Sequence, residues 1–405
     1  MKSSPKHLFA RLLLFSVSVS LLLEGARTAL SQPEKAGTQN TQVSKTPNSG
    51  NHLAPEALHM ADFILSLQTP DGAIVDEPGG SKVNEDSNME YALIGLGAAY
   101  QSSQESKYLQ GLEKGIQWLA EREEMSDPRW KGTWYFVYSA KTGEHLPSSP
   151  GPGMMDARGV DATSALFTYL LYLDKRLSHN SALADRYAAN GRAALDSVIR
   201  ENLAADGLSQ SSWLQSEKDK QWTLFEEQYS ADQGDVYLGM HAGELLYGDT
   251  KYAHVADGLK AKTSAMIFDA AQGRYALGRD SNGGLTSTDD GISAAFSQGY
   301  LTWIWGDSKE NRAATEWSRS KVNADGSIVT VPGKPSYSLT IAMLGAADAA
   351  LGAPTPAASL GWLLAHTYDP RTGGVHHSLD PKDNGEPNNE AGFCIIAFLR
   401  FLPFE

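Results

Sequence analysis

Helix-forming segments recur in pairs along this sequence. From Leu53 to the C-terminus, apolar residues repeat at helical spacing in segments that fall into six consecutive pairs. The first members are expected at 53–68, 105–123, 181–203, 250–268, 309–321 and 355–368. The second members are expected at 88–101, 161–177, 231–247, 289–305, 336–351 and 389–402. A helical hairpin cannot bury its apolar face alone, so the pattern predicts an all-α chain of stacked hairpins.

The two members of each pair differ in composition. First members carry charged residues on one face, whereas second members are rich in Gly, Ala and Ser and carry few charges. The latter composition is typical of helices enclosed on most sides. Long loops join the members of a pair and short connections join successive pairs, which predicts six outer helices around six inner ones with the long loops on one face. Within the second long loop, the alternating stretch 132–139 predicts a small β-hairpin arm.

This arrangement resembles the (α/α)6 barrel of the six-hairpin glycosidase superfamily, over almost all of residues 51–405. The superfamily includes glycoside hydrolases, polysaccharide lyases, and sugar epimerases and isomerases, so the fold does not fix the reaction. The resemblance implies a site on the long-loop face, where the inner helices begin.

Residues 1–50 have a different character from the rest. A basic start, an uncharged run at Leu12–Leu23 and a small-residue stretch near Ser31 are typical of a secretory signal over residues 1–31, although an uncleaved anchor would use the same features. Residues 32–50 are polar and rich in Pro, Gly, Ser and Thr, which predicts a flexible linker before a single barrel domain at 51–405. We therefore expect an exported protein, periplasmic or extracellular, with no stable membrane span after signal removal.

Acidic residues open most of the predicted inner helices. Such residues are also favoured as helix caps, but five acidic helix starts in one ring would converge and raise some of their pKa values. Glycoside hydrolysis needs a carboxylic acid and a carboxylate on either side of the scissile bond. We expect Glu90 and Asp232 to act as acid and base, with Asp161 as the next candidate. Substrate contacts are expected from the other helix-start residues: Asp235, Asp289, Asp290, Tyr337 and Glu390.

One segment carries a closer resemblance. The stretch from Ser230 to Tyr237 is similar to the Asp-rich inner-helix motif of glycoside hydrolase family eight. That likeness implies that an Asp there contacts substrate and that a Glu on an earlier inner helix donates the proton, which here matches Glu90. The sequence departs from the family pattern around Glu90, where Met and Tyr flank the acid, and in the spacing of the paired aspartates. Enzymes of this superfamily mostly invert, which implies carboxyl groups roughly 6.5–9.5 Å apart.

Aromatic residues in the long loops are the second feature of the predicted site. Flat rings can stack on the apolar faces of sugars, although the same rings could pack the loops onto the barrel. The candidates are Trp130, Trp134, Trp213 and Trp222.

Composition excludes several other classes. The formal net charge is −14, with 34 Lys and Arg against 48 Asp and Glu, which argues against nucleic acid as a partner. A single Cys excludes a disulfide scaffold and a Cys-built metal centre. His376 and His377 have no third ligand at metal-site spacing, and no cofactor-binding motif is present, so we expect neither a metal nor a cofactor.

The sequence thus predicts a secreted glycoside hydrolase acting on a neutral polysaccharide or oligosaccharide. A lyase or epimerase acting on uronates is one alternative, and a non-catalytic glycan-binding toroid is another. The stretch Gln68–Gly72 also resembles the start of the terpene-cyclase repeat, but the Trp of that repeat is missing. Nothing in the sequence indicates the oligomeric state.

Overall fold

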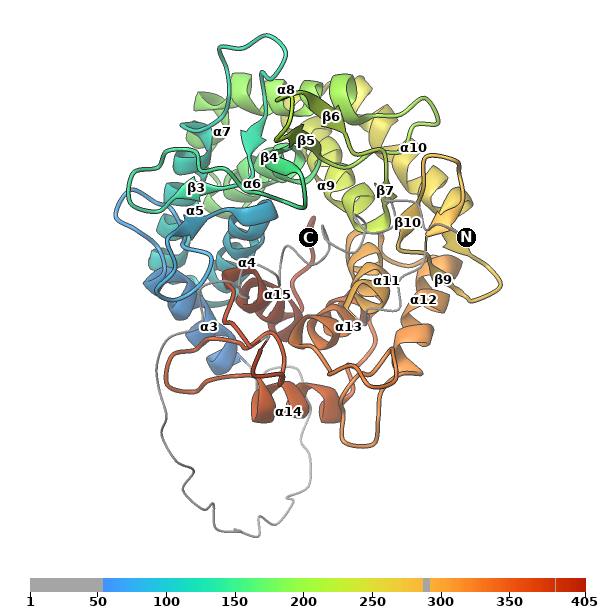
Figure 1. Cartoon of the computed structure of the whole chain (residues 1–405). Helices are drawn as coiled ribbons and strands as arrows, with labels where there is room; N and C mark the ends of the chain where they lie inside the picture. The colour runs from blue at the N-terminus through green and yellow to red at the C-terminus, as the bar shows by residue number, and fades with distance from the viewer. Residues whose placement is uncertain (1–53, 287–291, 383) are drawn as a thin grey trace.

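Six helices form a closed inner ring in the computed structural model, which describes residues 54–286, 292–382 and 384–405 (Figure 1). Each inner helix contacts the next, and the sixth returns to the first, so the ring closes. The inner helices are α4 (Asn88–Ser103), α6 (Ala162–Ser178), α9 (Ser230–Tyr247), α11 (Ile292–Trp305), α13 (Ser338–Ala350) and α15 (Asn388–Leu399). The predicted signal, the linker, Asp289 and Asp290 lie outside the described residues.

A second layer of helices surrounds this ring, as the amphipathic pattern of the first members predicts (Figure 1). Each outer helix packs on one or two inner helices. The outer helices are α3 (Ala54–Ser66), α5 (Ser106–Ala120), α8 (Ala188–Ser197), α10 (Thr250–Met266), α12 (Lys309–Arg319) and α14 (Ala357–His366). The architecture is an (α/α)6 barrel, and the predicted all-α class is confirmed. No helix in the described part of the chain combines the length and apolarity that crossing a membrane requires.

The third outer segment departs from the prediction of one continuous helix. It is divided into α7 (Ala182–Arg186), α8 and a π-helical turn, η3 (Val198–Asn202). The break falls at Tyr187, whose φ of −105° and ψ of 20° are not helical. Asn190 and Gly191, which follow, have low helix propensity and do not favour one unbroken helix.

Glycines in the inner helices allow close helix–helix contacts. A Cβ atom built on Gly95 would lie 2.7 Å from the Cα of Gly392, where α4 meets α15. A Cβ atom on Gly239 would lie 2.3 Å from the carbonyl oxygen of Ala165, where α9 meets α6. Real Cβ atoms do not approach other atoms this closely, so the small residues of the second members set the diameter of the ring.

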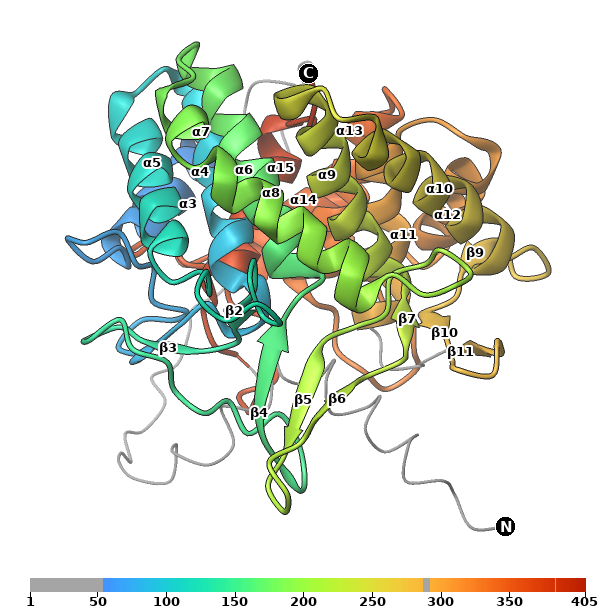
Figure 2. The same cartoon turned by 90° about the horizontal axis from the view of Figure 1, so that it is seen from above.

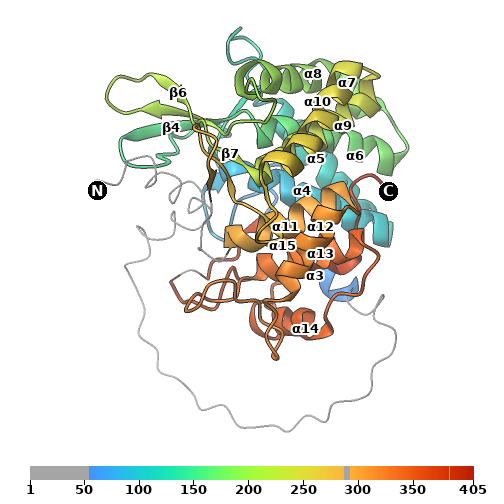
Figure 3. The ribbon, with the colours of Figure 1, turned by 90° about the vertical axis from the view of Figure 1, so that its right-hand side faces the viewer.

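Short strands lie beyond one end of the barrel, in the long loops (Figures 2 and 3). The largest sheet is antiparallel, in the order β2-β4-β5-β6. Its strands are β2 (Trp134–Tyr135), β4 (Met154–Gly159), β5 (Trp213–Ser216) and β6 (Trp222–Leu224). The others are β1 (Lys82–Val83), β3 (Tyr138–Ser139), β7 (Gln228–Tyr229), β8 (Phe268–Asp269), β9 (Arg274–Tyr275), β10 (Gly278–Arg279) and β11 (Leu285–Thr286).

The arm expected at 132–139 is built differently from a simple hairpin. Its two strands are present, but β2 pairs with β4 and β3 pairs with β1. The arm therefore links two sheets, because its strands find longer-range partners than each other.

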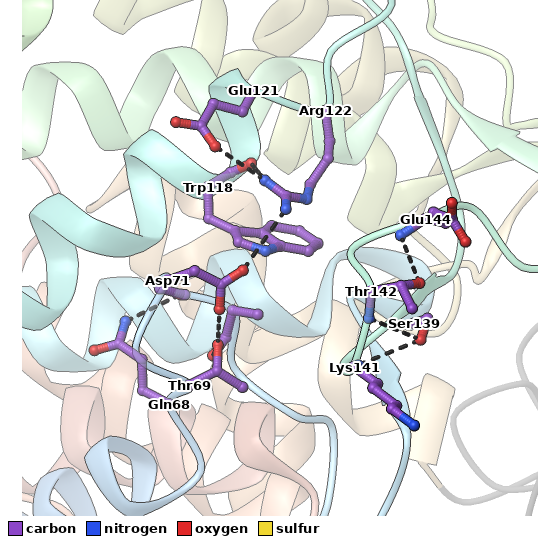
Figure 4. Close-up of polar contacts among 12 residues, drawn as sticks. Gln68, Thr69, Asp71, Trp118, Glu121, Arg122, Ser139, Lys141, Thr142 and Glu144 are labelled. Atoms are coloured by element: carbon purple, nitrogen blue, oxygen red, sulfur yellow. Dashed lines mark hydrogen bonds and ion pairs between the residues drawn. The ribbon is translucent and has the colours of Figure 1, made fainter.

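The first long loop is fixed to the outer helix α5 by Arg122 (Figure 4). Its guanidinium group lies 4.0 Å from the centre of the Trp118 ring and donates a hydrogen bond to the Trp118 carbonyl oxygen at 3.0 Å. The same group lies 3.7 Å from a carboxylate oxygen of Asp71 in the loop. These contacts place the beginning of the loop against the end of an outer helix.

The close approach at Gly239 gives a direct test of the ring. We expect Gly239→Ala to lower the free energy of unfolding by about 1–3 kcal/mol, because the added methyl group overpacks the α6–α9 contact. Gly361→Ala is the matched control: this glycine lies on the exposed face of α14 with no atom near an added Cβ. That change should raise stability by up to about 1 kcal/mol through helix propensity. Chemical denaturation of both variants measures the difference, and equal effects would contradict the packing described.

Candidate active site

Carboxyl groups gather where three neighbouring inner helices begin. Asp161 is the N-cap residue of α6, Asp232 lies in the first turn of α9, and Asp86 lies in the turn η2 (Glu85–Ser87) that leads into α4. Helix α6 contacts both α4 and α9, so the three starts are adjacent in the ring. They lie at the same end of the barrel as the long loops and their strands (Figure 2). The structure therefore brings together acids that are up to 146 positions apart in sequence.

The carboxyl groups of Asp161 and Asp232 hydrogen-bond to each other. Burial, the charge of Asp161 and the charge of Asp235 all raise the pKa of Asp232 well above its ordinary value. Burial also raises the pKa of Asp161, while the bond from Asp232 lowers it. Two carboxyl groups can hydrogen-bond only when one of them is protonated, so the pair holds at least one proton. The hydroxyl of Ser212, in the loop before β5, also donates to Asp161 at 3.3 Å.

Asp86 is the third member of this group. Burial raises the pKa of Asp86 to about 7, with further contributions from the charges of Asp161 and Glu85. Asp86 and Asp232 are each partly exposed, whereas Asp161 is only 4% exposed. Asp86 was expected only as one of several acids near the start of an inner helix, not as a site residue. Its placement depends on a left-handed backbone (φ 52°), which no sequence pattern signals at a non-glycine residue.

Glu90 lies in the first turn of α4, four residues after Asp86, and is completely buried. Its Oε1 accepts a hydrogen bond from the Asn84 amide at 3.2 Å, whereas its Oε2 is buried with no hydrogen-bond partner. Burial is the main reason why the pKa of Glu90 is raised to about 8, and the bond from Asn84 opposes this shift. Glu90 therefore carries a proton at neutral pH but has no surface for a substrate to touch.

Asp235 lies one turn below Asp232 and is also buried. Its Oδ1 accepts a hydrogen bond from the Tyr91 hydroxyl at 2.9 Å and another from the Tyr300 hydroxyl. Burial raises the pKa of Asp235 to about 8, although both tyrosine hydroxyls oppose the shift. Glu90 and Asp235 are thus buried acids, whereas Asp86 and Asp232 are partly exposed.

Glu390 begins α15, which contacts α4 from the side opposite α6 (Figure 1). Its Oε1 lies 2.5 Å from Nδ1 of His377, and its Oε2 accepts a hydrogen bond from the Ser338 hydroxyl. The Tyr337 ring lies 5.0 Å from the His377 ring. Two predicted substrate residues, Tyr337 and Glu390, are therefore joined by a histidine in a buried cluster at the starts of α13 and α15. The pairing of Glu390 with His377 was not expected from the sequence.

The predicted aromatic residues divide between the core and a cluster in the loops. Trp134 is buried in the core, where its Nε1 donates to the Leu119 carbonyl oxygen at 2.8 Å. Trp130 packs edge-on against Trp213 and is tilted against Trp222, with ring centres 5.4 Å apart in both pairs.

The guanidinium groups of two arginines pack against the rings of this aromatic cluster. The Arg158 guanidinium lies 3.9–5.5 Å from the ring centres of Trp130, Tyr135 and Trp222. The Arg129 guanidinium lies 4.5 Å and 5.2 Å from those of Trp130 and Trp213. The cluster therefore joins strands β4, β5 and β6 of the four-stranded sheet to the loop that holds Arg129 and Trp130.

Within the described residues, no group of three or more His, Cys, Asp or Glu side chains has the arrangement of a metal site.

Comparisons with known proteins agree with the fold. No protein-family model matches the sequence, and no curated protein matches it. Among solved structures, a D-mannose isomerase superposes with a TM-score of 0.64 at 10% identity, covering 88% of this chain and 99% of the isomerase. A cellobiose 2-epimerase from Bacillus thermoamylovorans B4167 gives 0.61 at 13% identity, covering 87% of this chain and 100% of the epimerase. A wild-type glycosidase gives 0.56 at 13% identity, covering 86% and 97%. The chain therefore shares its (α/α)6 barrel fold with these proteins.

Proposed function

We propose that this chain is an exported carbohydrate-active enzyme, and specifically a glycoside hydrolase that cleaves a neutral oligosaccharide or polysaccharide. One observation carries the proposal: Asp86, Asp161 and Asp232 converge from three helix starts, where burial and neighbouring carboxyl groups raise the pKa values of Asp86 and Asp232. Perturbed carboxyl groups of this kind are typical of acid–base catalysis. That neighbours of the same fold include glycosidases as well as sugar epimerases supports a carbohydrate substrate.

The geometry divides the roles as follows. Two carboxyl groups that hydrogen-bond directly to each other leave no room for a water molecule between them, so Asp161 and Asp232 together supply one role. In its singly ionised form, this pair supplies the carboxylate that acts as general base and activates water. Asp86 is the proton donor for the leaving oxygen, because it is partly exposed and its pKa is about 7. The proposal moves the donor role from Glu90 to Asp86, since Glu90 has no exposed surface.

A neutral substrate follows from the charge of this group. In the described part of the chain, Asp86, Asp161 and Asp232 form no ion pair with Lys or Arg, although Lys82 lies 3.5 Å from the nearby Glu85. Ionised uronates would add further negative charge beside partly ionised carboxyl groups, which is unfavourable at short range. Attack by water from the face opposite the leaving group would invert the anomeric configuration.

A sugar epimerase or isomerase is the second candidate, because of the His377–Glu390 pair. An imidazole oriented by a carboxylate is suited to moving a proton on carbon beside a carbonyl group. Incubation with reducing sugars in deuterated water separates the two functions. Deuterium uptake into sugar without bond cleavage would favour the epimerase and count against the hydrolase.

Substitution of the three carboxyl groups tests the hydrolase. We expect Asp86→Asn, Asp161→Asn and Asp232→Asn each to lower kcat by about 10²–10⁴-fold, because each removes a proton donor or a proton acceptor. The measurement is release of reducing ends from a panel of neutral saccharides.

Asp174→Asn is the matched control for these variants. Asp174 is also buried, and burial raises its pKa to about 7, but it lies at the far end of α6, roughly 20 Å along the helix from Asp161. Its substitution should leave kcat within about twofold of the wild type, the usual effect of a site remote from the chemistry. Equal activity in all four variants would refute the proposed roles.

The pH dependence of kcat/KM tests which carboxyl group is the donor. A donor must be protonated, so activity should fall as pH rises through about 7, the pKa of Asp86. The residual activity of Asp86→Asn should lack this fall. A fall of the same size in Asp86→Asn would contradict the assignment of Asp86 as the donor.

A further inference from the structure

Three left-handed residues lie together at the start of α4. Asn84, Asp86 and Ser87 have φ values of 61°, 52° and 70°. L-residues other than glycine rarely adopt this conformation, and each instance costs free energy. Elsewhere in the described residues, positive φ at non-glycine positions occurs singly, at helix C-caps such as Gln104 or in exposed turns such as Lys220. Among the described residues, only this turn concentrates such strain, and its Asn84 and Ser87 side chains are buried.

Hydrogen bonds from residues outside the turn hold its backbone in this conformation. The carboxylate of Asp76 accepts the backbone N–H groups of Asn84 at 2.9 Å and of Glu85 at 3.2 Å. The backbone carbonyl oxygen of Asp76 in turn accepts the N–H of Asn388, at the start of α15, at 2.8 Å. The turn is thereby tied to the opposite neighbour of α4.

The Asn84 side chain joins this turn to the helix that follows. Its Oδ1 accepts the Met89 N–H at 3.1 Å and its Nδ2 donates to Oε1 of Glu90 at 3.2 Å. The Ser87 hydroxyl lies 2.9 Å from that of Thr163, in the first turn of α6. Contacts with α4, α6 and α15 therefore fix a backbone shape that Asp86 and its neighbours would not adopt on their own.

We propose that Asn84 is a positioning residue, which holds the strained turn Asn84–Ser87 so that the Asp86 carboxyl group faces Asp161 and Asp232. The effect of Asn84 on catalysis rests on the proposed hydrolase function. Its effect on the position of Asp86 does not depend on that function. A relaxed turn would let Asp86 move toward solvent and away from the charged groups around it. Those groups are Glu85 on the same turn, Asp161 on α6, Asp232 and Asp235 on α9, and Tyr229 on β7.

Asn84→Gly is the main test. Glycine adopts the left-handed conformation without strain, but it removes the bonds to Met89 and Glu90. We expect the pKa of Asp86 to fall from about 7 toward the ordinary value near 4. NMR of ¹³C-labelled aspartate carboxyl carbons measures this titration, and the spectrum of Asp86→Asn assigns the Asp86 signal. On a substrate that the wild type cleaves, kcat should fall by on the order of a hundredfold while KM changes little, as expected for a misplaced proton donor.

Gln104→Gly is the matched control, because Gln104 has a φ of 60° at the exposed C-cap of the same helix. This variant should relieve strain there and leave both the Asp86 titration and kcat unchanged. Thr163→Ala keeps the proposal testable if Asn84→Gly does not fold, since it cuts the tie from α6 without altering the turn. It should shift the Asp86 titration in the same direction by a smaller amount.

The outcomes separate the two proposals. An unchanged Asp86 titration in Asn84→Gly, or in Thr163→Ala where the former is unfolded, overturns the positioning role whatever the activity. A lowered Asp86 pKa supports it. If the wild type cleaves no saccharide while the titration shifts as expected, the hydrolase proposal fails and the positioning stands.

Discussion

The site depends on one electrostatic constraint: several carboxyl groups are buried where neighbouring helices begin. Removing a carboxylate from water is costly, and placing others beside it adds repulsion, so the protonated forms are favoured. Burial is the largest cause of the raised pKa values of Asp86, Glu90 and Asp235, and neighbouring acids add to it. A protonated carboxyl group near neutral pH is a proton donor, so the same constraint that opposes folding also creates acid–base chemistry.

The barrel makes this constraint possible. A ring of parallel inner helices directs every N-terminus to one end, and small residues such as Gly239 bring the helices close enough for their first turns to interact. The resulting acids fall into two groups. Asp86 and Asp232 are partly exposed, while Glu90 and Asp235 are buried. In the proposed site the exposed acids contact the substrate, and the charge of the buried Asp235 raises the pKa of Asp232.

Periodicity alone predicted much of this fold. All six helical pairs are present in the structure, and the start of α5 at Ser106, for example, lies one residue from its expected position. The convergence of Asp161 and Asp232 could be anticipated for the same reason, since both open inner helices. Other features depend on contacts that no local pattern carries. Asp86 is placed by a left-handed turn held from distant segments, and the loop tryptophans stack on arginines from other strands. Glu390 pairs with His377 across a loop whose path the sequence does not specify.

The most direct test of this account is the pH dependence of the free energy of unfolding. An acid whose pKa is raised on folding binds a proton more tightly in the folded state, so its contribution to stability is greatest below its unfolded pKa and is lost as pH rises through its folded pKa. For Glu90 that window runs from about 4.5 to about 8. Denaturant unfolding between pH 5 and 8 should therefore show stability falling by several kcal/mol in the wild type and less steeply in Glu90→Gln. The exposed Glu121→Gln should retain the wild-type slope. Stability that rises with pH across this window, or an identical slope in Glu90→Gln, would contradict the claim that these buried carboxyl groups are protonated at neutral pH.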